Sequence, residues 1–170
     1  GLDPAPRPFL KWAGGKRQLI GTIEESLPRG FDDGSIERYI EPFLGGGALF
    51  FHLRQKYDIR DFYISDFNPD LANCYTAIRD DLDGVLDCLK GLADEYLPLS
   101  HEDRADVFYR VREGYNKTRV ECFESDSQDT IRILRAAQTI FLNRTCFNGL
   151  FRVNSRGDYN VPHGRYRNPP

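Results

Sequence analysis

The 170-residue sequence contains no methionine, a single tryptophan and no CxxC pair. Four widely spaced cysteines argue against a zinc site or a disulfide framework, and we expect no bound metal: Cys74, Cys88, Cys122 and Cys146. No apolar run approaches the roughly 20 residues that cross a bilayer, and the opening residues 1–8 lack the apolar stretch of a signal peptide. We therefore expect a cytoplasmic globular protein with reduced thiols and no membrane contact, in which residues 1–8 are a processed end, a remnant of cloning or a loose tail.

A strong positive charge, the usual sign of a nucleic-acid binder, is also missing, because the net charge is −3. The charge is nevertheless uneven along the chain. Residues 80–130 hold fourteen acidic and six basic side chains, whereas residues 144–170 hold five arginines and one aspartate. The basic C-terminal segment could face phosphate groups or form an ordinary solvated surface, and charge alone leaves both interpretations open.

The first half of the sequence has the order of a nucleotide-binding α/β sheet. Residues 38–43 predict a strand, which is followed by three glycines, a helix over 48–55 and a second strand over 62–65. Asp66 ends the second strand, 21 residues after Gly45, close to the ~20 expected for a ribose-binding carboxylate. This pattern predicts a nucleotide-like ligand at the glycines. A plain tight turn, with Asp66 as a helix N-cap, is the alternative.

The second half reads as helices followed by a hairpin. Helical periodicity covers residues 68–89, 83–114 and 128–143, with a polar loop over 121–129, and an earlier helix is predicted over 17–27. Residues 147–165 alternate as a hairpin around a turn at 154–158. Arginine and asparagine side chains there are suited to reading base edges, although a structural hairpin with basic decoration fits the same pattern.

Four segments resemble, in the same order, the motifs of Dam-type (D12 class) DNA adenine-N6 methyltransferases, which include restriction-system enzymes that methylate GATC: FLKWAGGK, EPFLGGGALFF, SDFNPDL and NRTCFNGLFRVNSRGDYNVPHGRY. The resemblance spans residues 9–169. It implies a Rossmann-like S-adenosylmethionine-binding sheet over 9–79, incomplete in this chain. It also implies a helical target-recognition domain over 80–168, carrying a DNA-binding hairpin at 143–167.

The resemblance also implies roles for individual residues. Contacts to S-adenosylmethionine are implied for Trp12, Ala13, Lys16, Phe43, Gly45 and Asp66. Double-stranded DNA is the implied partner, with guanine read by Lys11 and a DNA interface at Phe147, Asn148, Leu150, Arg152 and Pro162. The family usually carries tyrosine where Phe147 stands, so the stacking surface is kept and one hydroxyl contact is lost. From the residues alone, Trp12 could equally be a core anchor and Lys16 a solvated lysine.

The family's catalytic Asp-Pro-Pro-Tyr motif does not occur in these residues. Residues 168–170 (Asn-Pro-Pro) are not taken as a variant, because they directly follow the hairpin phrase VPHGRY and the required aromatic residue is absent. We therefore expect no catalytic residue in this chain, and either a missing segment or a complementary C-terminal chain. Two other functions stay open: a non-catalytic, sequence-specific DNA-binding module and an NAD-dependent oxidoreductase, although the full GxGxxG pattern is missing.

Overall fold

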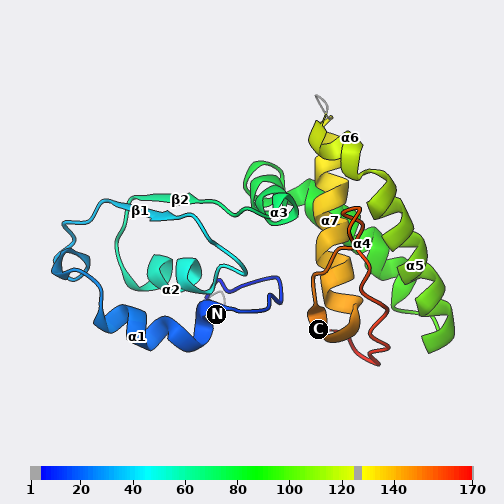
Figure 1. Cartoon of the computed structure of the whole chain (residues 1–170), viewed down its shortest axis with the longest axis horizontal. Coiled ribbons are helices and arrows are strands. Elements are labelled where there is room, and N and C mark those ends of the chain that lie inside the picture. The colour runs from blue at the N-terminus through cyan, green and yellow to red at the C-terminus, as the bar shows by residue number, and fades with distance from the viewer. Residues whose placement is uncertain (1–4, 125–127, 170) are drawn as a thin grey trace. The chain divides into compact units, whose positions relative to one another are not determined.

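The computed structural model describes residues 5–124 and 128–169 (Figure 1) and divides the chain into two compact units, Gly1–Phe67 and Asn68–Pro170. The sequence placed the division at residue 79. It falls earlier because helix α3 (Pro69–Asp80) packs against α7 (Asp129–Thr145) and so belongs to the second unit. Within the described residues, no helix combines the length and the apolar character that a membrane span requires.

The first unit is built on two parallel strands, as the sequence predicted. Strand β1 (Arg38–Glu41) pairs in register with β2 (Asp61–Ile64), and helix α2 (Ala48–Lys56) forms the crossover between them (Figure 1). The predicted helix over 17–27 is a short 3-10 turn, Lys16–Leu19, followed by α1 (Ile20–Glu25). A second 3-10 turn, Arg29–Phe31, precedes β1.

The two faces of this small sheet differ because successive side chains in a strand point to opposite sides. Tyr39 and Phe62 are paired across the strands, and Phe62 meets Phe50 of α2 with ring centroids 5.4 Å apart. On the other face, the cross-strand pair Ile40 and Tyr63 is 64 % and 54 % exposed. One face is therefore packed against a helix, while the other presents apolar side chains to solvent.

The second unit is helical and is arranged around α7, against which α3, α4 and α5 pack (Figure 1). The predicted helix over 68–89 is divided at Asp81, whose carboxylate accepts a hydrogen bond from the backbone N–H of Gly84 over 2.9 Å and so starts a new helix. The expected loop over 121–129 is also partly wrong, because residues up to 124 are helical; residues 125–127 lie outside the described residues. The remaining helices are α4 (Leu82–Tyr96), α5 (His101–Lys117) and α6 (Arg119–Glu124).

A buried ion pair ties α3 to α7. Arg135 is 1 % exposed and Asp70 is 6 % exposed, and their Nε and Oδ1 atoms lie 2.7 Å apart. The guanidinium also lies 3.8 Å from the ring centroid of Tyr115 in α5. The pair therefore links three helices at one point of the core.

None of the four cysteines forms a disulfide, in agreement with the sequence prediction. Cys74, Cys122 and Cys146 are buried, and burial raises the pKa of the Cys74 thiol to about 12. Buried thiols of this kind behave as small apolar side chains.

Candidate functional site

The glycine-rich turn lies at the carboxyl ends of both strands. The backbone N–H of Gly45 donates to Oδ2 of Asp66 over 2.8 Å, and the N–H of Leu44 donates to the carbonyl of Ser65 over 3.0 Å. Gly45 (φ 58°) and Gly47 (φ 79°) are in the left-handed region, which favours glycine. The structure thus brings together the turn after β1 and the acidic residue after β2.

Trp12 packs directly on this turn. A Cβ atom added to Gly46 would lie 3.2 Å from Cβ of Trp12, and one added to Gly45 would lie 3.5 Å from its Cδ1 atom. A side chain at Gly46 would therefore crowd Trp12, whereas a Cβ atom at Gly45 would lie at an ordinary van der Waals distance from it. Trp12 is half-buried, so it packs on the turn and still leaves part of its ring accessible beside Gly45.

Lys16 is fixed at the same turn by a residue that the sequence analysis did not single out. Its Nζ atom lies 2.6 Å from Oε1 of Glu41 and also donates to the carbonyl of Phe43. Glu41 is 3 % exposed and accepts a second hydrogen bond, over 3.1 Å, from the hydroxyl of Tyr39. Burial, and then the negative charge of Glu41, raise the pKa of Tyr39. The only sequence signal for Glu41 was a charged residue at the end of an apolar strand.

The six residues predicted to contact a cofactor are thus grouped around one turn, with two qualifications. Phe43 contributes its carbonyl to Lys16, while its side chain is 72 % exposed. Ala13 is exposed and adjoins Trp12 in the chain. The alternative role of Asp66 as the cap of α3 is wrong, because the Oδ1 atom of Asn68 accepts hydrogen bonds from the N–H groups of Asp70 and Leu71 over 2.9 and 3.3 Å.

The C-terminal ribbon, residues 147–167, is antiparallel and turns at 154–158, as predicted. The N–H of Phe147 donates to the carbonyl of Pro162 over 2.9 Å, and the N–H of Asn160 donates to the carbonyl of Arg152 over 3.1 Å. The pairing amounts to two isolated bridges, Cys146 with His163 and Val153 with Tyr159. The expected start at residue 143 is too early, since α7 continues to Thr145.

The residues predicted to contact DNA lie in both units. In the ribbon, Phe147 is 50 % exposed, and Asn148, Arg152 and Pro162 are also exposed. Leu150 is half-buried and packs against the core of the second unit. Lys11 is exposed in the first unit. Four of the predicted ribbon residues are therefore accessible to solvent, whereas Leu150 is partly committed to packing.

Asn116 and Arg112 of helix α5, together with Arg119 of α6, hold the ribbon through side chains that sequence reasoning missed. The amide of Asn116 donates to the carbonyl of Tyr159 over 3.0 Å and accepts from its N–H over 2.8 Å. Arg112 donates to the carbonyl of Val161 over 3.0 Å, and Arg119 donates to that of Arg156 over 3.2 Å. These partners are 37 to 49 residues apart in sequence, so no local pattern predicts them.

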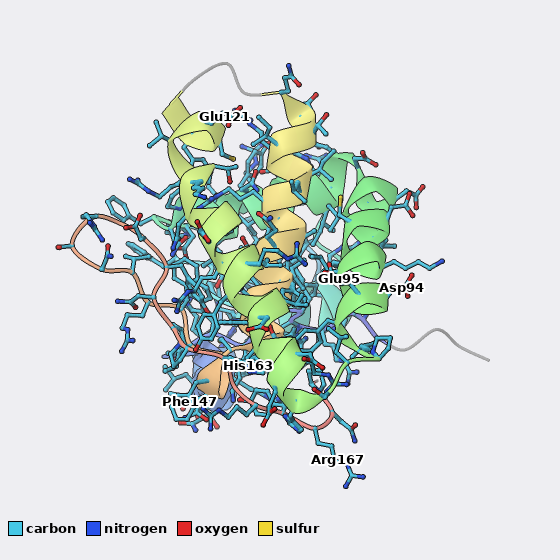
Figure 2. The ribbon with its side chains drawn as sticks, turned by 90° about the vertical axis from the view of Figure 1, so that its right-hand side faces the viewer. Asp94, Glu95, Glu121, Phe147, His163 and Arg167 are labelled. Atoms are coloured by element: carbon cyan, nitrogen blue, oxygen red, sulfur yellow. The ribbon has the colours of Figure 1, made fainter. Side chains whose placement is uncertain are left out.

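The turn of the ribbon and the acidic residues of α4 lie on different sides of the second unit. Figure 2 shows Phe147 and the turn of the ribbon on one side of α5 and Asp94 and Glu95 of α4 on the other, while the end of the ribbon, at Arg167, lies below them. The exposed charged residues of the ribbon are mostly arginines: Arg152, Arg156, Arg165 and Arg167. A polyanion approaching the ribbon side would therefore meet positive charge, despite the overall charge of −3.

A buried histidine closes the base of the ribbon. The Nε2 atom of His163 lies 2.6 Å from the hydroxyl of Tyr96, and its Nδ1 atom is buried without a hydrogen-bond partner among residues 5–124 and 128–169. Burial lowers the pKa of His163, and the positive charges of His101, Arg165 and Arg104 act in the same direction. Burial and these charges therefore favour the neutral imidazole at the point where the ribbon rejoins the core.

Comparisons with known proteins agree with this arrangement. Residues 12–170 match the family model described as D12 class N6 adenine-specific DNA methyltransferase. The type II methyltransferase M.MjaIII of Methanocaldococcus jannaschii is 49 % identical over 163 residues, which are 96 % of this chain and 54 % of the relative. The DNA adenine methylases of Serratia marcescens and Escherichia coli (strain K12) are 39 % and 37 % identical, over 96 % of this chain and 51 % and 49 % of their own lengths. The chain thus spans about half the length of the curated relatives it matches.

Proposed function

The chain belongs to the D12 class N6 adenine-specific DNA methyltransferase family, and we propose that it forms the S-adenosylmethionine-binding and DNA-recognising part of an enzyme that methylates adenine in double-stranded DNA. The observation that carries this proposal is the hydrogen bond between Gly45 and Asp66 beneath Trp12, at the carboxyl ends of two parallel strands. Sheets of this kind bind nucleotides at that edge. In this proposal the first unit is part of a Rossmann-like sheet and the second is the target-recognition domain.

The side chains around the turn fit the chemical groups of S-adenosylmethionine. The carboxylate of Asp66 is suited to the ribose hydroxyls, and the ammonium of Lys16 is suited to the carboxylate of the methionine portion. Trp12 and Phe43 would provide apolar surface beside the adenosine, with Ala13 next to them. When bound, the cofactor supplies an electrophilic methyl group on a sulfonium.

The charge at the turn favours this ligand over NAD. The positive charge of Lys16 is balanced by the buried carboxylate of Glu41 at 2.6 Å. A pyrophosphate carries negative charge only and would meet an almost neutral pair, whereas the methionine portion carries one carboxylate and two positive groups, the ammonium and the sulfonium. The sequence after Gly47 also lacks the remaining glycine of the dinucleotide pattern.

The ribbon fits the role of a DNA reader. The half-exposed ring of Phe147 offers a surface for stacking or for insertion between bases, and the guanidinium of Arg152 can pair with a guanine edge. Asn148 and Pro162 would contact DNA beside Phe147, Leu150 would support the contact from the core side, and Lys11 would read guanine from the first unit. The proposed target is GATC, which rests on the similarity of the ribbon to that family.

The adenine N6 atom is a weak nucleophile because its lone pair is delocalised into the ring. The base must therefore leave the duplex and be held so that nitrogen faces the methyl group in line with sulfur. No Asp-Pro-Pro-aromatic sequence occurs in these 170 residues, so we assign the amino-group acceptor to none of them. Methyl transfer would then require that motif from a further segment or a complementary chain. We place the activity of the enzyme in the cytoplasm.

Calorimetric titration of the chain with S-adenosylmethionine and with NAD tests the cofactor, and duplex binding measured with and without each cofactor tests the DNA partner. We expect S-adenosylmethionine to bind and NAD not to bind. Binding of NAD alone would identify an oxidoreductase-type site. Sequence-dependent duplex binding without any cofactor binding would identify a DNA-binding module. Methyl transfer by this chain alone at the rate of an intact enzyme would refute the proposal that none of its residues accepts hydrogen bonds from the adenine amino group.

A further inference from the structure

Asn116 makes the same pair of backbone hydrogen bonds to the ribbon that a residue of a neighbouring β-strand would make. Its side-chain amide both donates to and accepts from the main chain of Tyr159, over 3.0 and 2.8 Å. A primary amide presents one donor and one acceptor side by side, so this two-point contact fixes the position and orientation of one peptide segment. A ribbon with only two isolated bridges of its own thus gains a rigid attachment to α5.

The peptide held by Asn116 leads directly to an exposed arginine. Asn160, the next residue after Tyr159, accepts from Nε of Arg152 through its Oδ1 atom over 2.7 Å, and its carbonyl accepts from Nη2 over 3.4 Å. The N–H of Asn160 also donates to the carbonyl of Arg152 over 3.1 Å. Both the backbone and the guanidinium of Arg152 are therefore oriented by Asn160, whose own position depends on the adjacent peptide.

We propose that Asn116 is a positioning residue for Arg152 and, through it, a determinant of base specificity in double-stranded DNA. This inference rests on the proposed DNA-binding function. Reading a base edge by two parallel hydrogen bonds requires a guanidinium plane held in a narrow range of directions. A loop arginine without such support would lose more side-chain freedom on binding and would pair with several bases about equally well.

The neutrality of Asn116 separates this role from that of its charged neighbours. Arg112 and Arg119 hold the same ribbon, but their removal would also change the positive charge that attracts phosphates. Replacing Asn116 by alanine removes two hydrogen bonds and no charge. The dependence of affinity on salt should therefore stay unchanged, because that slope reports the number of neutralised phosphates.

The experiment measures binding of the full chain to a pool of duplexes with a randomised core, followed by sequencing of the bound fraction. Four proteins are compared with the wild type: Asn116→Ala, Arg152→Ala, the double variant and Asn73→Ala. Asn73 is the matched control, because its amide donates to a backbone carbonyl, that of Arg132, over 2.9 Å between α3 and α7. Salt titrations on one enriched and one depleted duplex complete the set.

We expect Asn116→Ala to lower the preference at one base pair about tenfold, with the affinity for depleted duplexes and the salt slope unchanged. Arg152→Ala should abolish the preference at the same base pair. The double variant should show no further loss of preference relative to Arg152→Ala. Asn73→Ala should keep the wild-type preference.

Two results would overturn the inference while leaving the proposed function intact. One is an equal loss of affinity for all duplexes in Asn116→Ala, and the other is a loss of preference that persists in the Arg152→Ala background. A wild-type chain that enriches no sequence would overturn the proposed DNA recognition itself. If Asn116→Ala does not fold, Asn160→Ala breaks the contact to Arg152 at an exposed site, and it must then show the same loss at the same base pair.

Discussion

The ammonium of Lys16 lies 2.6 Å from the carboxylate of Glu41, which is almost fully withdrawn from solvent. A buried carboxylate that loses its partner retains the cost of its own desolvation. We therefore expect Lys16→Met to destabilise the chain more than the double variant Lys16→Met/Glu41→Gln, in which no unpaired charge remains. Urea unfolding of both variants and the wild type measures the difference. Equal stability of the two variants would show that Glu41 is adequately solvated without Lys16.

Replacement of Asp66 separates support of the turn from binding of a ligand. Asp66→Asn keeps an oxygen that can accept from the N–H of Gly45, whereas Asp66→Leu does not. We expect the asparagine variant to unfold near the wild-type urea concentration but to bind S-adenosylmethionine at least about tenfold more weakly, since hydrogen bonds to a charged group contribute about 1.5–3 kcal/mol. The leucine variant should lose both stability and binding. Unchanged calorimetric affinity in Asp66→Asn would remove Asp66 from the proposed binding site.

The buried pair of Arg135 and Asp70 gives a prediction about stability alone. Arg135→Met leaves the carboxylate of Asp70 buried and unpaired, which should cost about 3–5 kcal/mol of unfolding free energy. The double variant Arg135→Met/Asp70→Leu replaces the pair by apolar groups and should recover most of that loss. Urea denaturation followed by circular dichroism measures both. A double variant as unstable as the single one would mean that packing on Tyr115, rather than charge, is the main contribution.

Protonation of His163 should make the second unit sensitive to acid. Its pKa in the folded chain lies below the ordinary value of 6.5, so the unfolded chain binds the extra proton more readily. The contribution of neutral His163 to the free energy of unfolding is therefore fully present above pH 6.5. It is lost as the pH falls from 6.5 through the pKa of His163 in the folded chain. His163→Gln, which offers Tyr96 an acceptor that does not titrate, should flatten the pH dependence of the melting temperature in that range. An identical acid profile in the variant would assign the effect to other groups.

The sequence predicted those features that depend on local patterns. The strands, the glycine turn and the turn at 154–158 were found because glycine, alternation and turn residues act over a few positions; Asn154, for instance, accepts from the N–H groups of Arg156 and Asp158 over 2.9 and 3.0 Å. The break at Asp81 was missed, since apolar periodicity continues across it. Contacts between distant residues were also missed, because which polar groups meet, as Lys16 meets Glu41 or Asn116 meets Tyr159, is decided by tertiary packing.

The ribbon illustrates this limit most clearly. Alternating residues correctly indicated two antiparallel segments, but not that helix α5 would pair with the outer edge of one of them. The ribbon's own hydrogen bonds flank the pair Val153 and Tyr159, so the N–H and carbonyl of Tyr159 point away from the other segment and pair with Asn116 instead. A pattern in the sequence of one segment carries no information about such a partner on another.

The uncovered pair Ile40 and Tyr63 has a practical consequence for handling the protein. Parallel sheets are normally covered on both faces, and an exposed apolar surface next to a strand edge promotes self-association of the protein. The protein should therefore aggregate or form soluble oligomers as its concentration is raised. Ile40→Lys should raise the protein concentration at which light scattering detects aggregation, and it leaves the residues of the glycine turn unchanged.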